Sequence, residues 1–283
     1  MKIPSRTWVG KMSHNRKHGA SSRPGVDVVI ITGGRWDFLK QCLEALDKQT
    51  VPVNIILLDN ASDSEERIQN SNLFDGISTK RIQQRLGFPA ANNEAVRMGT
   101  APIVLFLNDD CILNENAIEK ILESMKDETI GVCGAKLIFP LSPTGQGRPA
   151  GKVQHVGMAL NIRGEVVHPL LGWSPDNPKC KVSRDVFSVT GACFMTRRSL
   201  FNQVGGFDTS YGIGTYEEVQ FCQQAKSLGK RVYVNCEATG YHYAGATAEK
   251  NKVAYPLQMN ALTFRSRFMG SPFMTYDEYK FYD

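Results

Sequence analysis

The sequence contains no long hydrophobic run and no paired cysteine motif. No stretch approaches the roughly eighteen apolar residues that a membrane span needs, and the N-terminus has no apolar signal core. We therefore expect a cytoplasmic protein without a transmembrane segment, with peripheral binding at a membrane surface as the alternative location. The seven cysteines are an odd number without a CxxC spacing. This pattern predicts buried, reduced thiols and argues against a disulfide framework or a zinc site.

A Walker A loop is also absent, and acidic residues are missing from residues 1–25. Those residues carry six lysines or arginines, whereas the whole chain of 283 residues has a net charge of +5, so the remainder is close to neutral. We predict a basic, flexible N-terminal tail over residues 1–25. Contact with a polyanion, either nucleic acid or an anionic membrane surface, is the alternative, although no DNA-binding motif accompanies the tail.

Two consecutive strand–turn–helix units follow this tail. Residues 28–31 form an apolar strand that leads through Thr32 into an amphipathic helix over residues 36–49. Residues 53–58 form the next strand, which ends at Asp59. Such units predict a right-handed, parallel βαβ arrangement. Because ligands bind at the carboxyl ends of the strands in these sheets, we expect Thr32 and Asp59 to lie at a binding site.

A third apolar strand, residues 103–107, runs directly into Asn108, Asp109 and Asp110. Adjacent carboxylates at the end of a buried strand cost desolvation and like-charge repulsion. A divalent cation compensates for both costs, and oxygen ligands of this kind suit Mg²⁺ or Mn²⁺. For these residues alone, a simple strand cap is the alternative interpretation, because Asn and Asp often end strands.

The rest of the chain continues as strands and helices. Asn93 lies in the first turn of a helix that starts near Pro89, and Glu217 and Glu218 follow a glycine-rich loop at the start of another helix. The helix dipole favours carboxylates at this position, so the acidic pair needs no functional explanation by itself. The other expected elements are a helix over 115–126 capped by Asn114, strands over 130–139, 189–195 and 231–235, a loop over 140–152, short strands and turns over 153–189, and helices over 197–204 and 256–268.

Seven stretches, taken in order, resemble glycosyltransferase family 2, and most closely its rhamnosyltransferase-like branch. They are VDVVIIT, IILLDNASD, RLGFPAANNEAVR, IVLFLNDDCIL, VTGACFMTRRSLFNQVGGFD, TYEEVQFCQQAKSLGKRVYVN and GYHYAGAT, and together they span residues 26–247. The resemblance implies an α/β chain with the GT-A fold, in which helices flank a Rossmann-like, mostly parallel central sheet with a small acceptor-side subregion. It implies one domain over residues 26–250 and leaves residues 251–283 as a C-terminal extension without an assigned role.

The resemblance also implies a set of donor-binding residues. Thr32 and Asp59 match positions that hold the nucleobase and the ribose, and Asn93 lies in the segment that lines the donor site. Asn108 and Asp109 match the first two residues of the DXD metal motif of the family. Asn108 replaces an acid there, so we expect metal affinity to depend on the bound diphosphate.

The same resemblance implies the metal ligands and the catalytic residues. Asp110 matches the last position of the DXD motif, and His242 matches a histidine that often completes the metal site for Mn²⁺ or Mg²⁺. Glu217 and Glu218 match the acidic pair at the start of the acceptor-side helix, and Glu218 falls at the position of the catalytic base. Gln220 stands where the family often has a second aspartate, so that support is absent from this chain.

These matches imply an inverting glycosyltransferase. Its donor is a nucleotide-diphosphate sugar, linked to UDP, dTDP or GDP, and its acceptor is a hydroxyl of a glycan, a lipid-linked sugar or another molecule. A catalytically inactive nucleotide-sugar-binding relative is one alternative. A nucleotidyltransferase is the other, and it would require a glycine- and lysine-rich loop after the first strand, which residues 32–35 resemble only faintly.

Overall fold

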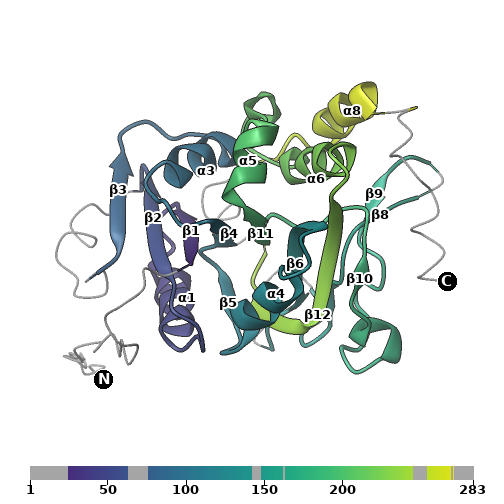
Figure 1. Cartoon of the computed structure of the whole chain (residues 1–283), viewed down its shortest axis with the longest axis horizontal. Helices are drawn as coiled ribbons and strands as arrows, with labels where there is room; N and C mark the ends of the chain where they lie inside the picture. Colours follow the sequence, from purple (N-terminus) through teal and green to yellow (C-terminus); the bar gives the residue numbers. More distant parts are fainter. Residues whose placement is uncertain are drawn as a thin grey trace, which may run out of the picture.

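The computed structural model describes residues 25–62, 76–141, 148–161, 163–244, 254–268 and 270. The basic tail predicted over residues 1–25 therefore lies outside the described residues, apart from Gly25. The described residues form an α/β fold in which helices cover both faces of a large central sheet (Figure 1). Within these ranges, every helix is too short or too polar to cross a bilayer.

The central sheet is mostly parallel, with an antiparallel strand, β11, near its middle and antiparallel pairings of the short strands β5, β7 and β10. The strands run in the order β10-β12-β6-β11-β4-β1-β2-β3, and β5 and β7 pair with β12 and β6. Strand β11 is antiparallel to both of its neighbours, whereas the pairs among β1, β2, β3 and β4 are all parallel. The bounds are β1 (Val26–Thr32), β2 (Asn54–Asn60), β3 (Ser78–Ile82), β4 (Ile103–Asn108), β5 (Cys111–Leu113), β6 (Ile130–Ile138), β7 (Val153–His155), β10 (Arg184–Asp185), β11 (Cys193–Arg197) and β12 (Arg231–His242). A separate hairpin joins β8 (Ala159–Leu160) to β9 (Val166–Val167).

The helices pack against the two faces of this sheet through separate apolar clusters. On one face lie α3 (Phe88–Val96), α5 (Arg198–Val204) and α6 (Glu217–Ser227), around five phenylalanines that contact one another in the core. On the other lie α1 (Trp36–Asp47) and α4 (Ala117–Ser124), which place their leucines and isoleucines on the sheet. The last helix, α8 (Leu257–Phe268), lies beside α6 (Figure 1). The described residues also form two short 3₁₀ helices, η2 (Pro178–Lys181) and η3 (Thr209–Tyr211).

Most expected elements are present, with ends displaced by a few residues. The predicted Asn114 cap is wrong: α4 begins after Asn116, and the Asn114 side chain instead donates to the hydroxyl of Thr239 on β12. The strand expected over residues 189–195 begins only at Cys193, because the preceding Thr190–Ala192 segment forms a turn in which the Cys193 N–H bonds to the Thr190 carbonyl.

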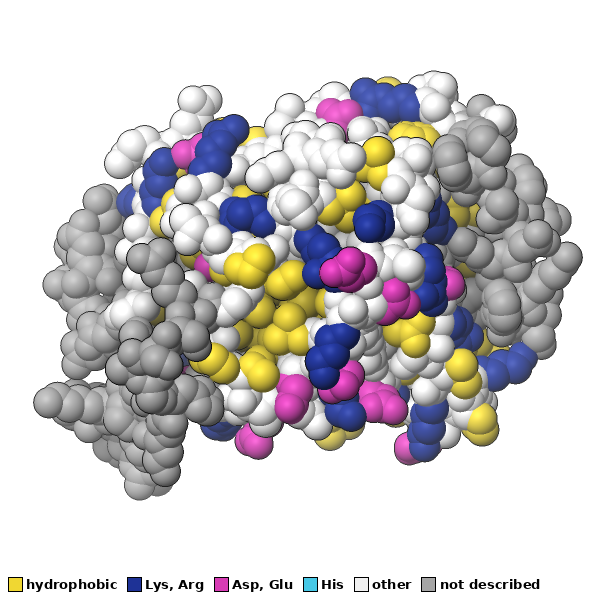
Figure 2. Space-filling view, in the orientation of Figure 1, with side chains coloured by type: hydrophobic (Ala, Val, Ile, Leu, Met, Phe, Trp, Pro, Cys, Tyr) yellow, Lys and Arg dark blue, Asp and Glu magenta, His cyan; other side chains and the backbone are white. Residues whose placement is uncertain are grey.

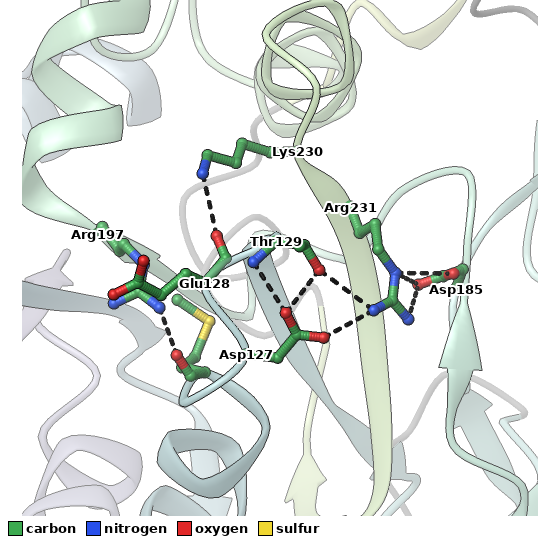
Figure 3. A network of polar contacts seen from close by, with 8 residues as sticks. Asp127, Glu128, Thr129, Asp185, Arg197, Lys230 and Arg231 are labelled. Atoms are coloured by element: carbon green, nitrogen blue, oxygen red, sulfur yellow. Dashed lines mark hydrogen bonds and ion pairs between the residues drawn. The ribbon is translucent and has the colours of Figure 1, made fainter.

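A polar network joins the amino ends of β6 and β12 to the carboxyl end of β10 (Figure 3). Arg231 donates to Asp127 at 2.9 Å and to Asp185 at 3.0 Å, and Asp127 accepts from the backbone and hydroxyl of Thr129. These groups are solvent-exposed, so each ion pair contributes about 1 kcal/mol or less. The network lies at the end of the sheet opposite the carboxyl ends where ligands bind in such folds. On the face shown in Figure 2, basic and acidic side chains are interspersed, as on an ordinary solvated surface.

Candidate functional site

The strand register brings the predicted donor-side residues to one edge of the sheet. Strand β1 lies between β2 and β4, so that Thr32 pairs with Asp59 and Ile31 pairs with Asn108. Strand β12 ends at His242, which pairs with the residue that follows Asp110. The carboxyl ends of four strands therefore meet where the sequence predicted a site.

Asp109 turns back towards the end of β1. It is 4% exposed and accepts hydrogen bonds from the Thr32 hydroxyl and the Gly33 N–H. Burial and then the neighbouring Asp110 charge raise the pKa of Asp109 to about 7, although the two hydrogen bonds favour the charged form. Among the described residues, no group bonds to its second carboxylate oxygen. A buried carboxylate oxygen of this kind is a free acceptor for a donor group or a cation.

Asp110 and His242 form a contact pair. The Oδ1 atom of Asp110 lies 3.1 Å from Nε2 of His242, and Nδ2 of Asn108 lies 3.2 Å from the same nitrogen. Nδ1 of His242 lies 2.7 Å from Oε1 of Gln154, and the Gln154 amide nitrogen donates to the His242 carbonyl. Gln154 therefore holds the proton on Nδ1 and presents Nε2 towards Asp110. This is the arrangement in which a histidine binds a metal ion through one nitrogen and is oriented through the other.

The donor set fits a hard cation that shares its coordination with a bound diphosphate. Within the described ranges, no group of three or more His, Cys, Asp or Glu side chains gathers in a metal-binding arrangement. Asp110 and His242 are two side chains that could hold a cation here. Mg²⁺ and similar ions are commonly held by only one or two protein groups, with substrate phosphates and water filling the other positions.

The two remaining donor-side predictions have definite partners in the structure. Asp59 is 1% exposed, accepts from the Ser62 N–H at 2.9 Å and pairs with Arg81 at 2.8 Å, so its buried charge is compensated. The side-chain amide of Asn93 exchanges two hydrogen bonds with the backbone of Phe207, at 2.7 and 2.9 Å. Asn93 therefore ties α3 to the loop after α5.

The acidic pair begins α6 after a strained turn. Thr215 and Tyr216 have φ values of 81° and 72°, in the left-handed region that non-glycine residues rarely adopt. Glu217 is buried and Glu218 is half-buried, and in the described part of the chain one buried carboxylate oxygen of each lacks a hydrogen-bond partner. Burial and then the Glu218 charge raise the pKa of Glu217 well above its usual range, and burial also raises the pKa of Glu218. Backbone strain beside unsatisfied carboxylates is typical of a catalytic site.

Further residues connect this acidic pair to the rest of the site. Glu218 accepts a hydrogen bond from the Gly191 N–H, and the preceding Thr190 N–H donates to Nε2 of buried His155. Tyr255 is 45% exposed and its ring lies near Gly214 in the turn before the pair. Partial burial and then the charges of Asp110 and Glu217 raise the pKa of Tyr255. No sequence motif pointed to His155 or Tyr255, nor to Gln154 and Arg81.

Three known relatives and structures share this architecture. O-antigen biosynthesis protein RfbC of Myxococcus xanthus is 24% identical over 81% of this chain, and uncharacterized protein y4gI of Sinorhizobium fredii is 23% identical over 79%. The chain spans 18% and 25% of the length of these two proteins. Among solved structures, GalNAc-T7 with UDP, GalNAc and Mn²⁺ superposes with a TM-score of 0.64, at 16% identity, over 92% of this chain and 58% of the other.

A second structure has a similar fold. The mannosyltransferase PcManGT of Pyrobaculum calidifontis, in complex with GDP-Man and Mn²⁺, superposes with a TM-score of 0.59, at 16% identity, over 92% of this chain and 70% of the other. These likenesses show the fold, which is that of the GT-A glycosyltransferases. The model of the family described as glycosyl transferase family 2 matches residues 27–205, so the chain belongs to glycosyl transferase family 2.

Proposed function

We propose that the protein is an inverting, metal-assisted glycosyltransferase that moves a sugar from a nucleotide-diphosphate sugar to an acceptor hydroxyl. The observation that carries this proposal is the presence of two buried acidic groups at one end of the fold, one after β4 and one at the start of α6. Each group keeps a carboxylate oxygen without a partner among the described residues. One group suits the donor diphosphate and its cation, and the other suits the acceptor.

On the donor side, Thr32 and Asp59 would bind the nucleoside, and Asn108 and Asp109 would belong to the donor site next to the cation. Asp110 and His242 would hold Mn²⁺ or Mg²⁺, which supplies charge neutralisation to the leaving diphosphate, worth several kcal/mol in comparable sites. Two structures with this fold are described with a nucleotide or nucleotide sugar and Mn²⁺, and TarS of S. aureus, which superposes with a TM-score of 0.52, is described with UDP-GlcNAc. They support a nucleotide-sugar donor linked to UDP or GDP, and dTDP is the third candidate nucleotide.

On the acceptor side, Glu218 would take the proton of the acceptor hydroxyl. The acceptor oxygen then forms a bond to the anomeric carbon while the bond from that carbon to the phosphate oxygen breaks, and the nucleoside diphosphate leaves. Glu217 lies beside it, and burial and then the Glu218 charge raise the pKa of Glu217, whereas burial raises the pKa of Glu218. A general base with a raised pKa is suited to accept a proton near neutral pH, and such catalysis typically contributes about 10²–10⁴-fold.

The experiment uses Glu218→Gln, which keeps the size of the side chain and removes the base. The wild-type protein is screened by thermal shift against UDP-, dTDP- and GDP-sugars with and without Mn²⁺, and slow transfer of the sugar to water is measured with the donor that stabilises most. We expect Glu218→Gln to lose about 10²-fold or more of this hydrolysis while it keeps the donor-induced shift. Glu237→Gln, an exposed residue of β12 paired with Lys120, is the matched control.

Full hydrolysis by Glu218→Gln would contradict the assignment of the base. Tight donor binding by the wild type without any hydrolysis would favour the inactive nucleotide-sugar-binding relative instead. The metal role is tested with Asp110→Asn, for which we expect the Mn²⁺-dependent part of the donor shift to disappear. A donor-induced thermal shift of the wild-type protein that is the same with Mn²⁺ and with EDTA would contradict that role.

A further inference from the structure

The C-terminal helix α8 packs directly on the loop that precedes the acidic pair. The family model ends at residue 205, so it covers neither α6 nor α8. Phe264 of α8 is fully buried and belongs to an apolar cluster with Phe187, Tyr211 and Val219. Figure 1 shows α8 lying alongside α6. The helix is therefore part of the folded core on the acceptor side.

One polar side chain of α8 reaches into the strained turn. Asn260 is 4% exposed, and its amide nitrogen donates to the carbonyls of Tyr211 at 3.1 Å, Gly214 at 2.8 Å and Thr215 at 3.0 Å, and to the Thr215 hydroxyl at 3.1 Å. Two amide hydrogens are shared among these four acceptors. Thr215 and Tyr216 have positive φ values, and Asn260 supplies a donor for the Gly214 and Thr215 carbonyls. The Tyr211 carbonyl accepts from Asn260 and also from the Gly214 N–H.

A second side chain of α8 holds the other end of the same loop. Arg267 donates to Asp208 at 2.7 Å, to Gln220 at 2.8 Å and to Ser210 at 3.0 Å, and its guanidinium lies 5.5 Å from the centre of the Tyr211 ring. Gln220 also accepts from the Tyr211 hydroxyl. Residue 220 is where the family often has an aspartate, and in this chain the position is tied to the C-terminal helix.

We propose that Asn260 is a positioning residue, which holds the turn over residues 211–216 so that Glu217 and Glu218 face the acceptor. The inference rests on the proposed role of Glu218. Glu217 follows the turn directly, so a relaxed Thr215–Tyr216 backbone would displace both carboxylates. A displacement of about 1 Å at a reacting group lowers turnover by as much as about 10²-fold. The donor nucleotide would bind at the β1, β2 and β4 ends and would not depend on Asn260.

The experiment compares Asn260→Asp, Asn260→Ala and the control Gln258→Ala. Asparagine and aspartate have nearly the same size, but the carboxylate cannot donate to the three carbonyls, whereas Gln258 is an exposed amide on the same helix. The assay is hydrolysis of the best-binding UDP-, dTDP- or GDP-sugar with Mn²⁺. We expect both Asn260 variants to lose about 10–100-fold in kcat while KM for the donor stays within about twofold. Gln258→Ala should behave like the wild type.

Two readouts separate positioning from a general loss of stability. The donor-induced thermal shift should remain in both Asn260 variants, and hydrogen exchange should become faster in residues 208–218 but not in the strands that bind the donor. A wild-type kcat in both Asn260 variants would overturn the inference. Unfolding of both variants, or loss of the donor-induced shift in both, would also overturn it and would assign Asn260 to folding alone.

Glu218→Gln is measured in parallel. If that variant hydrolyses the donor at the wild-type rate, the assignment of the base is wrong, and so is the positioning role of Asn260 that depends on it. If Glu218→Gln is inactive and the Asn260 variants are fully active, only the inference about Asn260 is wrong.

Discussion

Gly87 offers a direct test of how closely the donor-side helix and the acceptor loop must approach. It precedes α3, and a Cβ atom built at this position would lie 1.7 Å from the carbonyl oxygen of Gly212 and 2.6 Å from its carbonyl carbon. The next residue, Phe88, donates its N–H to the Ile213 carbonyl at 3.1 Å. We expect Gly87→Ala to push the loop over residues 211–216 away from α3, because both clashing partners are backbone.

The size of the effect follows from this geometry. An ordinary carbon–oxygen contact is about 3.3 Å, so the two segments must separate by roughly 1.6 Å. Overpacking of this kind costs about 1–3 kcal/mol, and loss of the Phe88–Ile213 hydrogen bond adds about 1 kcal/mol. The free energy of unfolding should therefore fall by about 2–4 kcal/mol, which lowers the melting temperature by roughly 5–15 °C for a chain of this size. Because the displaced loop leads directly into Glu217, donor hydrolysis should fall by about 10²-fold.

Chemical denaturation and donor hydrolysis with Mn²⁺ measure the two effects. Gly25→Ala is the control for the substitution itself, since no atom lies within 4 Å of a Cβ at that position. Equal stability and turnover in Gly87→Ala and Gly25→Ala would refute the claim that this contact positions the acidic pair.

Two further predictions concern buried charges. Arg198 lies 2.6 Å from Asp27, whose side chain is 1% exposed, so Arg198→Met should lower the free energy of unfolding by about 3–5 kcal/mol. Arg231→Met in the exposed network should lower it by about 1 kcal/mol or less. Equal losses of the two variants in urea denaturation would contradict this account. The pKa of Glu217 is raised by burial and by the Glu218 charge, so its contribution to stability is present at acidic pH and is lost as the pH rises through the raised pKa. The free energy of unfolding of Glu217→Gln should therefore rise relative to that of the wild type as the pH increases from about 4 to about 8. Parallel pH profiles of unfolding for the two proteins would show that the ionised carboxylate is not destabilising.

The order of strands and the places where they end follow from the local sequence. Alternating apolar runs and amphipathic helices specify parallel βαβ units, and these put the ends of β1, β2 and β4 at one edge of the sheet. Asp110 and His242 lie 3.1 Å apart, and their role as metal ligands stays a prediction. The acidic start of α6 is equally visible in the sequence, because a glycine-rich loop leads into a regular helix.

The partners of these residues depend on contacts between distant parts of the chain. Gln154 orients His242 across 88 residues, and Asn260 holds the Gly214 carbonyl across 46. A single buried amide has no periodicity or motif of its own, and its role depends on which segment packs against it. The sequence alone determines where carboxylates end strands and begin a helix. Tertiary packing determines which of these carboxylates are buried without partners and which acquire a raised pKa. It also determines that helix α8, whose own sequence shows only a helical pattern, packs on the turn that precedes the acidic pair.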